Sequence, residues 1–199
     1  SQKDIEKSVE LIKESRSKYS YQIDGAVLKV DSLQAQDELG YTSKSPRWAV
    51  AFKFPSEEQT TILKDIKLQT GRTGAITPVA VLEPIDVGGA KVSFATLHNP
   101  DEIKRKDLRI NDYVIVRRAG DVIPEVVSSL KDRRDGSQKK WELPKKCPCG
   151  EFSIELIDEE KVPRCEGGQS CNLAKKEAII FFGSKSGLEI EGLGRETVE

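Results

Sequence analysis

The stretch "ITPVAVLEPIDVGGAKVSFATL", residues 76–97, decides the fold of the larger part of the chain. It holds two runs in which apolar and polar residues alternate, and Gly88-Gly89 separates them, as expected for two strands joined by a tight turn. Similar runs, "TTILKDIKLQT" (60–70) and "DYVIVRRAG" (112–120), lie on either side of it. Short strands about ten residues apart with turn residues between them predict a small five-stranded β-barrel.

The residues before this region predict a mixture of helices and strands. Residues 2–18 carry apolar side chains at helical spacing, which predicts an amphipathic helix. Residues 21–31 and 47–54 alternate with a period of two and are rich in Val, Phe, Ala and Leu, which predicts two strands. Between them, residues 32–40 predict a short helix that ends at Gly40.

Each of these two strands carries one lysine on a face of small residues. Because side chains alternate along a strand, Lys29 shares its face with Gly25 in "DGAVLKV". By the same alternation, Lys53 shares its face with Ala49 and Ala51 in "PRWAVAFKFP". Both lysines therefore stand where the neighbouring side chains leave room.

The opposite face of the second strand carries Val50, Phe52 and Phe54, and we expect these bulky side chains to pack into a core. The faces with small residues then leave room for a ligand, into which the two ammonium groups project. Two fixed positive charges in a cleft suit a phosphate group. The alternative is that each lysine is the solvent-facing member of a half-exposed strand, which is the ordinary place for lysine.

Charge and hydropathy exclude some classes of protein. The 199 residues include 32 Lys+Arg and 33 Asp+Glu, a net charge of -1, so any nucleic-acid surface must be local. There is no apolar run long enough to span a membrane and no N-terminal secretion signal, so we expect a cytoplasmic protein with no membrane partner. The sequence contains no Met, and we expect it to be a piece of a longer protein.

Four cysteines follow a basic stretch, residues 131–146, that predicts a linker. One residue separates the first two cysteines, fifteen separate the two pairs and five separate the last two: Cys147, Cys149, Cys165 and Cys171. Four thiols in a chain without a secretion signal favour zinc over disulfides. Four thiolates around Zn²⁺ would hold together a segment too small to bury its own core, so we expect a structural site.

Five strings, taken in order, resemble bacterial NAD-dependent DNA ligases. "DGAVLKV" and "PRWAVAFKFP" resemble two nucleotidyltransferase motifs, and "GRTGAITPVAVLEP", "VSFATLHNPDEI" and "DLRINDYVIVRRAGDVIPEVV" resemble the oligonucleotide-binding (OB) barrel of that family. The resemblance implies a multidomain α+β chain. Its parts would be the C-terminal part of an adenylation (nucleotidyltransferase) domain at 1–58, a five-stranded OB-fold barrel at 59–137, a four-cysteine zinc finger at 138–172 and the beginning of a helix-hairpin-helix domain at 173–199.

The resemblance also implies a reaction and the residues that serve it. A lysine attacks NAD to give lysyl-AMP, AMP passes to the 5′-phosphate of a nick in duplex DNA, and the 3′-hydroxyl displaces AMP, in DNA replication and repair. Lys29 and Lys53 would contact the nucleotide and its α-phosphate. Asp24 would carry the acidic residue of the family, oriented toward a divalent metal or the pocket lysines; the alternative is a turn residue before Gly25. Mg²⁺ or Mn²⁺ would assist, although the sequence shows no ligand set for it.

The nucleophile of the family is a lysine in a Lys-x-Asp-Gly motif, and no such string occurs in the sequence. Gln22 and Ile23 precede Asp24-Gly25. We therefore expect the chain to begin after the nucleophile and to be inactive by itself, because attack on the phosphate needs that amine.

DNA contacts are expected at two places in the barrel. Arg72 and Thr73 lie between two glycines, a spacing that lets the backbone approach a phosphate closely. Arg117 and Arg118 are adjacent, so strand alternation puts them on opposite faces. By resemblance the barrel closes on the minor-groove side of nicked duplex DNA, as a monomer. The alternative for Arg72 and Arg118 is a solvated strand end. The single histidine, His98, favours a turn or packing role over catalysis.

Two features near the C-terminus complete the resemblance. Gly192-Leu193-Gly194 resembles the hairpin of a helix-hairpin-helix unit, where backbone N–H groups bind a DNA phosphate. The first cysteine pair, "CPCG", departs from the Cys-Pro-x-Cys-Gly of the family by one residue, so a strained or lost zinc site is the alternative there.

Two other classes of protein remain as alternatives. A non-catalytic DNA-binding module, made of a barrel and a zinc finger, would not need the two lysines to bind a nucleotide. An ATP-dependent ligase or capping-type enzyme shares the nucleotidyltransferase plan, but "DGAVLKV", "WAVAFKFP" and the four cysteines argue against it.

Overall fold

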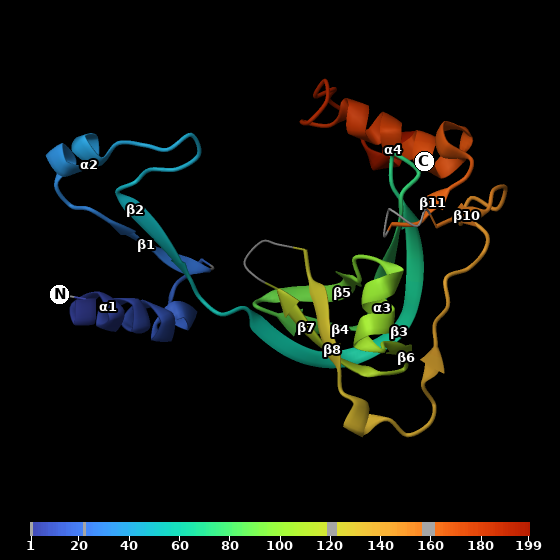
Figure 1. The fold of residues 1–199 in the computed structure, drawn as a ribbon, viewed down its shortest axis with the longest axis horizontal. Coiled ribbons are helices and arrows are strands. Elements are labelled where there is room, and N and C mark those ends of the chain that lie inside the picture. The colour runs from blue at the N-terminus through green and yellow to red at the C-terminus, as the bar shows by residue number, and fades with distance from the viewer. Residues whose placement is uncertain (1, 22, 119–122, 157–161) are drawn as a thin grey trace. The chain divides into compact units, whose positions relative to one another are not determined.

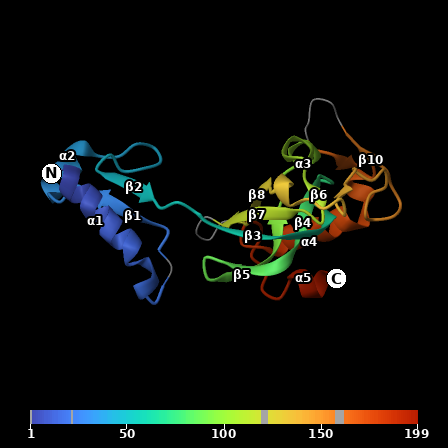
Figure 2. The same ribbon diagram turned by 90° about the horizontal axis from the view of Figure 1, so that it is seen from below.

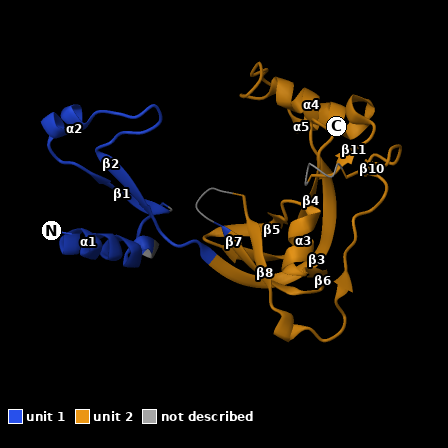
Figure 3. Ribbon diagram, in the orientation of Figure 1, with its two compact units in different colours: residues 1–57, 118–122 blue, residues 58–117, 123–199 orange. Residues whose placement is uncertain are grey.

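The computed structural model describes residues 2–21, 23–118, 123–156 and 162–199 (Figure 1). These residues divide into two compact units, one made of the residues up to Glu57 together with Arg118, and one made of residues 58–117 and 123–199 (Figure 3). Among the described residues, no helix is both long and apolar enough to cross a membrane.

The first unit consists of helices and a two-stranded antiparallel sheet. Its elements are α1 (Gln2–Glu14), the 3-10 turn η1 (Arg16–Lys18), β1 (Gly25–Lys29), α2 (Leu33–Leu39) and β2 (Ala49–Lys53). The short helix begins where the Ser32 hydroxyl accepts a hydrogen bond from the Ala35 N–H and ends at Gly40, whose φ is 64°. Helix α1 lies beside β1 (Figure 2). The elements expected from the sequence are therefore all present.

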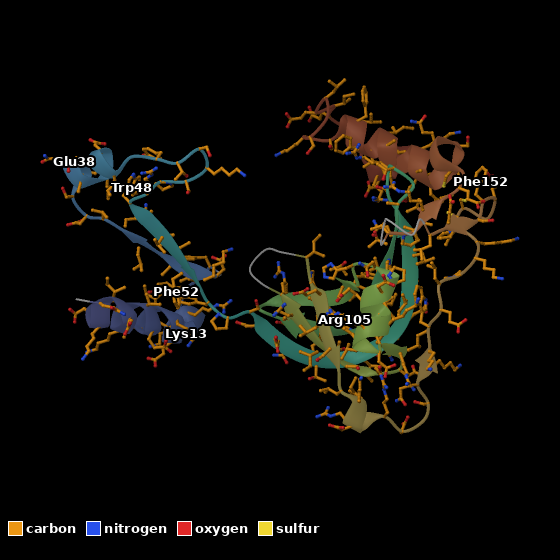
Figure 4. The ribbon with its side chains drawn as sticks, viewed as in Figure 1. Lys13, Glu38, Trp48, Phe52, Arg105 and Phe152 are labelled. Atoms are coloured by element: carbon orange, nitrogen blue, oxygen red, sulfur yellow. The ribbon has the colours of Figure 1, made fainter. Side chains whose placement is uncertain are left out.

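The expected apolar core of this unit is only partly formed. Phe54 is buried, but Val50 is 65% exposed. Phe52, which is labelled in Figure 4, is 48% exposed. The prediction that all three pack into a core is wrong within this chain. A sheet of two strands has too few neighbouring elements to cover its faces, so side chains on both faces of β2 remain in solvent.

The second unit contains the five-stranded barrel that the sequence predicted. Its strands are β3 (Glu57–Thr70), β4 (Ile76–Val87), β5 (Ala90–Thr96), β7 (Tyr113–Arg118) and β8 (Glu125–Ser129), closed in the order β3-β4-β5-β8-β7. All pairs described are antiparallel except the parallel contact between Thr96 of β5 and Glu125 of β8. Closure removes the exposed strand edges that an open sheet would leave.

The core of the barrel follows the alternation of its strands. Inward-facing residues such as Leu63, Ala80 and Val116 are completely buried. Helix α3 (Pro100–Lys106), which the sequence analysis did not predict, adds Ile103 to this core. Its signal is present in the sequence: the Asn99 side chain accepts a hydrogen bond from the backbone N–H of Glu102, and Pro100 occupies the first helical position.

The basic stretch at residues 131–146 is part of the fold, so its prediction as a linker is wrong. Strand β9 (Lys139–Lys140) pairs with β6 (Arg109–Ile110), after the 3-10 turn η2 (Lys131–Arg133). The side chain of Arg134 is only 16% exposed and forms ion pairs with Asp107 and Asp112, at 2.7 and 2.8 Å. These two aspartates precede Arg134 by 27 and 22 residues in the sequence, and their ion pairs hold the stretch against the barrel.

The remaining elements follow the barrel in the second unit. They are β10 (Ile154–Glu155), β11 (Arg164–Cys165), the 3-10 turn η3 (Gly168–Ser170), α4 (Asn172–Gly183) and α5 (Arg195–Val198). Helix α4 begins immediately after the last cysteine, with Cys171 in the N-cap position. Figure 1 shows the end of the β3–β4 hairpin reaching toward β11 and α4.

Candidate functional site

The pairing of β1 with β2 places both candidate lysines on the same face of their sheet. Gly25 is opposite Lys53, and Lys29 is opposite Ala49. Directly opposite residues in an antiparallel pair project to the same side. The two lysines are four residue steps apart along the sheet, roughly 13 Å at about 3.4 Å per residue. They can therefore reach different parts of one extended ligand.

Gly25 is required by the close approach of the two strands. A Cβ atom at this position would lie 2.5 Å from the carbonyl oxygen of Phe52 and 3.0 Å from the Cα of Lys53. Both neighbours are backbone atoms, which cannot move aside without breaking the pairing. The glycine of the Asp-Gly pair therefore brings the backbone of β1 directly under Lys53.

Asp24 lies next to Lys53, just before β1 begins. Its carboxylate Oδ2 is 3.7 Å from the Lys53 Nζ, and its carbonyl oxygen accepts a hydrogen bond from the Phe54 N–H at 2.9 Å. The two side chains are 60% and 76% exposed. An exposed ion pair contributes little to stability, so both groups remain available to a ligand.

The four cysteines come together, although they are spread over 25 residues of sequence. Their sulfur atoms all lie within 4.8 Å of one another, and Cys147, Cys165 and Cys171 are buried. Four thiolates at about 2.3 Å from Zn²⁺ stand roughly 3.8 Å apart, so this cluster fits a tetrahedral zinc site after small adjustments. When bound, zinc would supply the cross-link that holds the surrounding loops together.

The shortened "CPCG" loop still gives its sulfurs backbone donors. The Cys149 N–H donates to the Cys147 sulfur, and the N–H groups of Glu151 and Phe152 donate to the Cys149 sulfur. The Gly167 N–H does the same for Cys165. N–H groups around thiolates stabilise their negative charge in metal sites. The missing residue therefore does not remove the amide support.

The protonation of these thiols differs with their surroundings. Burial raises the pKa of Cys165 to about 12 and also raises that of Cys147. Burial acts in the same direction on Cys149, but the backbone donors around its sulfur outweigh it and lower its pKa to about 7. Zinc binds thiolates, so a bound cation would have to offset the burial of Cys147 and Cys165.

The cysteine cluster is joined to the end of the β3–β4 hairpin. The Ile76 N–H donates to the carbonyl of Pro163 at 2.8 Å, and the Cys165 N–H donates to the carbonyl of Gly74 at 2.9 Å. Ile76 also belongs to the same buried cluster as Cys147, Cys165 and Cys171, together with Ala174 of α4. The finger and the barrel therefore share hydrogen bonds and apolar contacts.

Arg72 and Thr73 occupy the exposed turn of this hairpin. The guanidinium carbon of Arg72 lies 4.0 Å from the centre of the Phe181 ring in α4. The carbonyl of Thr73 accepts a hydrogen bond from Arg164 at 3.3 Å. The turn that the sequence suggested as a DNA contact is thus attached to both the finger and α4.

The other predicted arginine pair is less open to a ligand. Arg117 donates to the Glu125 carboxylate from Nε at 3.0 Å, and His98 Nε2 lies 3.2 Å from the other oxygen of the same carboxylate. The hydrogen bond from Arg117 is the main reason why the pKa of Glu125 is lowered. Arg118 is the last residue of β7 and is half-buried. An intramolecular ion pair competes with a phosphate for Arg117.

His98 lies in the turn between β5 and α3, with a φ of 62°. Its backbone N–H donates to the Thr96 hydroxyl at 3.1 Å. This geometry agrees with the turn role expected from the sequence. The contact with Glu125 is the part of its environment that the sequence did not indicate.

The glycines near the C-terminus form a turn that packs back on α4. Gly192 has a φ of 82°, and Gly194 precedes α5. A Cβ atom at Gly183 would lie 2.7 Å from the Leu193 carbonyl oxygen, so α4 and this turn are in close contact. Helix α5 has four residues, and a DNA-binding role of Gly192 and Gly194 stays a prediction.

Two family models match the chain, and both describe the same enzyme. The model of the NAD-dependent DNA ligase adenylation domain matches residues 1–57, and that of the NAD-dependent DNA ligase OB-fold domain matches residues 60–138. The class is therefore that of nucleotidyltransferases with an attached oligonucleotide-binding barrel. More particularly, the chain belongs to the NAD-dependent DNA ligase family, and its parent enzyme is a DNA ligase that uses NAD⁺.

Proposed function

We propose that the first unit supplies one wall of the adenylate pocket and that the barrel and the C-terminal turn bind the backbone of nicked duplex DNA. The observation that carries this proposal is the register of β1 and β2, which puts Lys29 and Lys53 on one face beside small residues. A register shifted by one residue would have put the two charges on opposite faces of the sheet. One extended phosphate-containing ligand such as NAD can contact both.

The two lysines act on phosphorus oxygens. When an amine attacks the α-phosphate of NAD, negative charge grows on the oxygens that do not leave, and nearby ammonium groups stabilise it. Asp24, 3.7 Å from the Lys53 ammonium, orients that lysine or a divalent cation, Mg²⁺ or Mn²⁺, that assists the reaction.

The DNA-binding residues belong to the second unit and to the end of β7. We assign phosphate contacts to the exposed hairpin and to the C-terminal turn, in addition to the arginine pair: Arg72, Thr73, Arg117, Arg118, Gly192 and Gly194. Arg72 is the strongest member because its side chain is exposed at a turn. Arg117 is the weakest because Glu125 already neutralises it.

The zinc finger has a structural role in this proposal. Its residues hold the β3–β4 hairpin in place through backbone pairing at Gly74 and Ile76. We place the boundaries of the four parts near residues 58, 137 and 172. We further propose that the enzyme acts as a cytoplasmic monomer in DNA replication and repair.

The test is Lys53→Ala in a ligase that contains these residues together with a Lys-x-Asp-Gly motif. Labelled NAD reveals lysyl-AMP on a denaturing gel, and we expect its formation to fall by at least about 100-fold, the usual loss when a stabilising donor is removed. Lys44→Ala is the matched control, because Lys44 is an exposed lysine of the same unit on a loop.

Normal lysyl-AMP formation by Lys53→Ala would remove this lysine from the pocket. If the variant also bound nicked DNA normally, the alternative of a non-catalytic DNA-binding module would describe this part of the enzyme better. Loss of lysyl-AMP in the Lys44→Ala control would instead show that the assay reports general damage to the unit.

A further inference from the structure

The guanidinium of Arg72 rests on an aromatic ring that comes from a distant part of the chain. Its carbon is 4.0 Å from the centre of the Phe181 ring. Arg72 is exposed, and Phe181 is 37% exposed, so the stack lies at the surface of the second unit. Stacks of this kind are attractive because the ring face is negative and the guanidinium is positive.

Stacking restricts the arginine without using its donors. A guanidinium stacks through its flat face, whereas its five N–H donors project from the edge of the same plane. The edge of Arg72 therefore remains available to phosphate oxygens while the ring limits the number of side-chain rotamers. A side chain held in this way loses less freedom when it binds a phosphate.

Both partners of the stack are attached to the cysteine cluster. The hairpin that carries Arg72 is paired with the finger at Gly74 and Cys165. Helix α4, which carries Phe181, begins directly after Cys171 and buries Ala174 in the same cluster. The same buried cluster therefore positions Arg72 through the hairpin and Phe181 through α4.

We propose that Phe181 is a positioning residue that orients Arg72 toward a DNA phosphate. Phe181 acts through Arg72 and does not itself contact the DNA. The four-cysteine centre keeps the hairpin and α4 at the separation that the stack needs. This inference rests on the proposed function, in which Arg72 contacts DNA.

The experiment measures binding of nicked duplex DNA by the parent ligase over a series of salt concentrations. Phe181→Leu removes the ring face, and we expect affinity about two- to fivefold weaker, the range for an exposed cation–π contact. Phe181→Tyr keeps the ring and should bind as the wild type does. Phe182→Leu is the matched control, because Phe182 is an adjacent, exposed phenylalanine on the same helix.

A double-mutant cycle shows whether Phe181 acts through Arg72. Arg72→Ala should weaken binding and lower the slope of log affinity against log salt by about one. In the Arg72→Ala background, Phe181→Leu should have no further effect, because the group that it orients is gone. Zinc content per chain, measured by elemental analysis, should be the same in all variants.

The outcomes separate the two levels of the proposal. If Arg72→Ala leaves binding and its salt slope unchanged, the DNA contact of Arg72 is wrong and the proposed function loses that residue. If Arg72→Ala weakens binding but Phe181→Leu does not, or tightens it, the positioning role is overturned while the DNA contact stands. An equal loss from Phe181→Leu in both backgrounds also overturns it. Should Phe181→Leu lose zinc, Phe181→Met replaces it in the same cycle.

Discussion

The two units of the chain use similar strands in different ways. In the first unit, β1 and β2 form a two-stranded sheet whose apolar residues Val50 and Phe52 stay exposed. In the second, five strands close into a barrel, and residues such as Leu63 and Val116 are completely buried. Alternating apolar residues therefore predict a strand in both units, but burial depends on whether enough neighbouring strands or helices are present to cover the face.

Removing zinc should have the largest effect on stability, because it would leave part of the second unit as exposed to solvent as the sheet of the first unit. We expect one zinc ion per chain and, after chelation, protease cleavage both in residues 147–171 and in the hairpin turn at 71–75. A structural zinc site stabilises its fold by on the order of 10 kcal/mol. Limited proteolysis with mass spectrometry, before and after chelation, measures the change.

The barrel core around Leu63 serves as the internal control for this experiment, because its contacts do not involve the cysteines. A hairpin that stays protected after zinc is lost would show that the finger and the barrel are independent. Four reactive thiols and no metal in the purified chain would mean that the cluster does not bind zinc.

Truncating one apolar side chain in each unit should sharpen the comparison. Leu63→Ala in the barrel core should lower the free energy of unfolding by about 2–5 kcal/mol, because it leaves a cavity among completely buried residues. Phe52→Ala on the open sheet should change the free energy of unfolding of this chain by about 0.5 kcal/mol or less. Urea denaturation, followed by the fluorescence of Trp141 in a Trp48→Phe background, reports on the barrel.

Trp141 is suitable because it packs against the barrel core. The fluorescence of Trp48 in a Trp141→Phe background gives the matching measurement for the first unit. Equal losses from the two truncations would contradict the difference in burial on which the comparison depends.

A smaller effect is expected from pH, and it should be confined to the second unit. Hydrogen bonds from Arg134 are the main reason why the pKa of Asp107 is lowered to about 2, against an ordinary value of 3.8. A carboxyl group with a lowered pKa stabilises the fold above its unfolded pKa, and this contribution is lost as pH falls from about 4 toward 2. The stability of the wild type should therefore fall in this range.

Asp107→Asn tests this cause directly. Asn tolerates the left-handed backbone at this position, where φ is 49°, so the variant removes the titrating carboxyl group without straining the backbone. The difference in the free energy of unfolding between pH 5 and pH 3 should be smaller in the variant than in the wild type. The same pH dependence in both would assign the acid sensitivity to other carboxyl groups.

Much of the fold could be predicted from local patterns. Ser32 and Gly40 mark the two ends of α2. The alternation of apolar and polar residues on either side of the Gly88-Gly89 turn marks β4 and β5. Helix α3 was also predictable from local sequence, because Asn99 and Pro100 are ordinary helix-start residues. The linker prediction for residues 131–146 failed for a different reason, since the partners of Arg134 are far away in sequence.

The candidate site also has features that the sequence predicts and features that depend on tertiary contacts. The sequence alone indicated the candidate residues Lys29, Lys53 and the four cysteines, as well as the resemblance to NAD-dependent DNA ligases. These signals depend on alternation, turn residues and spacing, which are local properties of the sequence. That the two lysines share one face depends on the register of β1 with β2. The stack of Arg72 on Phe181 depends on the packing of the hairpin, the finger and α4 around one buried cluster. Both are contacts between residues distant in sequence, which only packing in three dimensions can select.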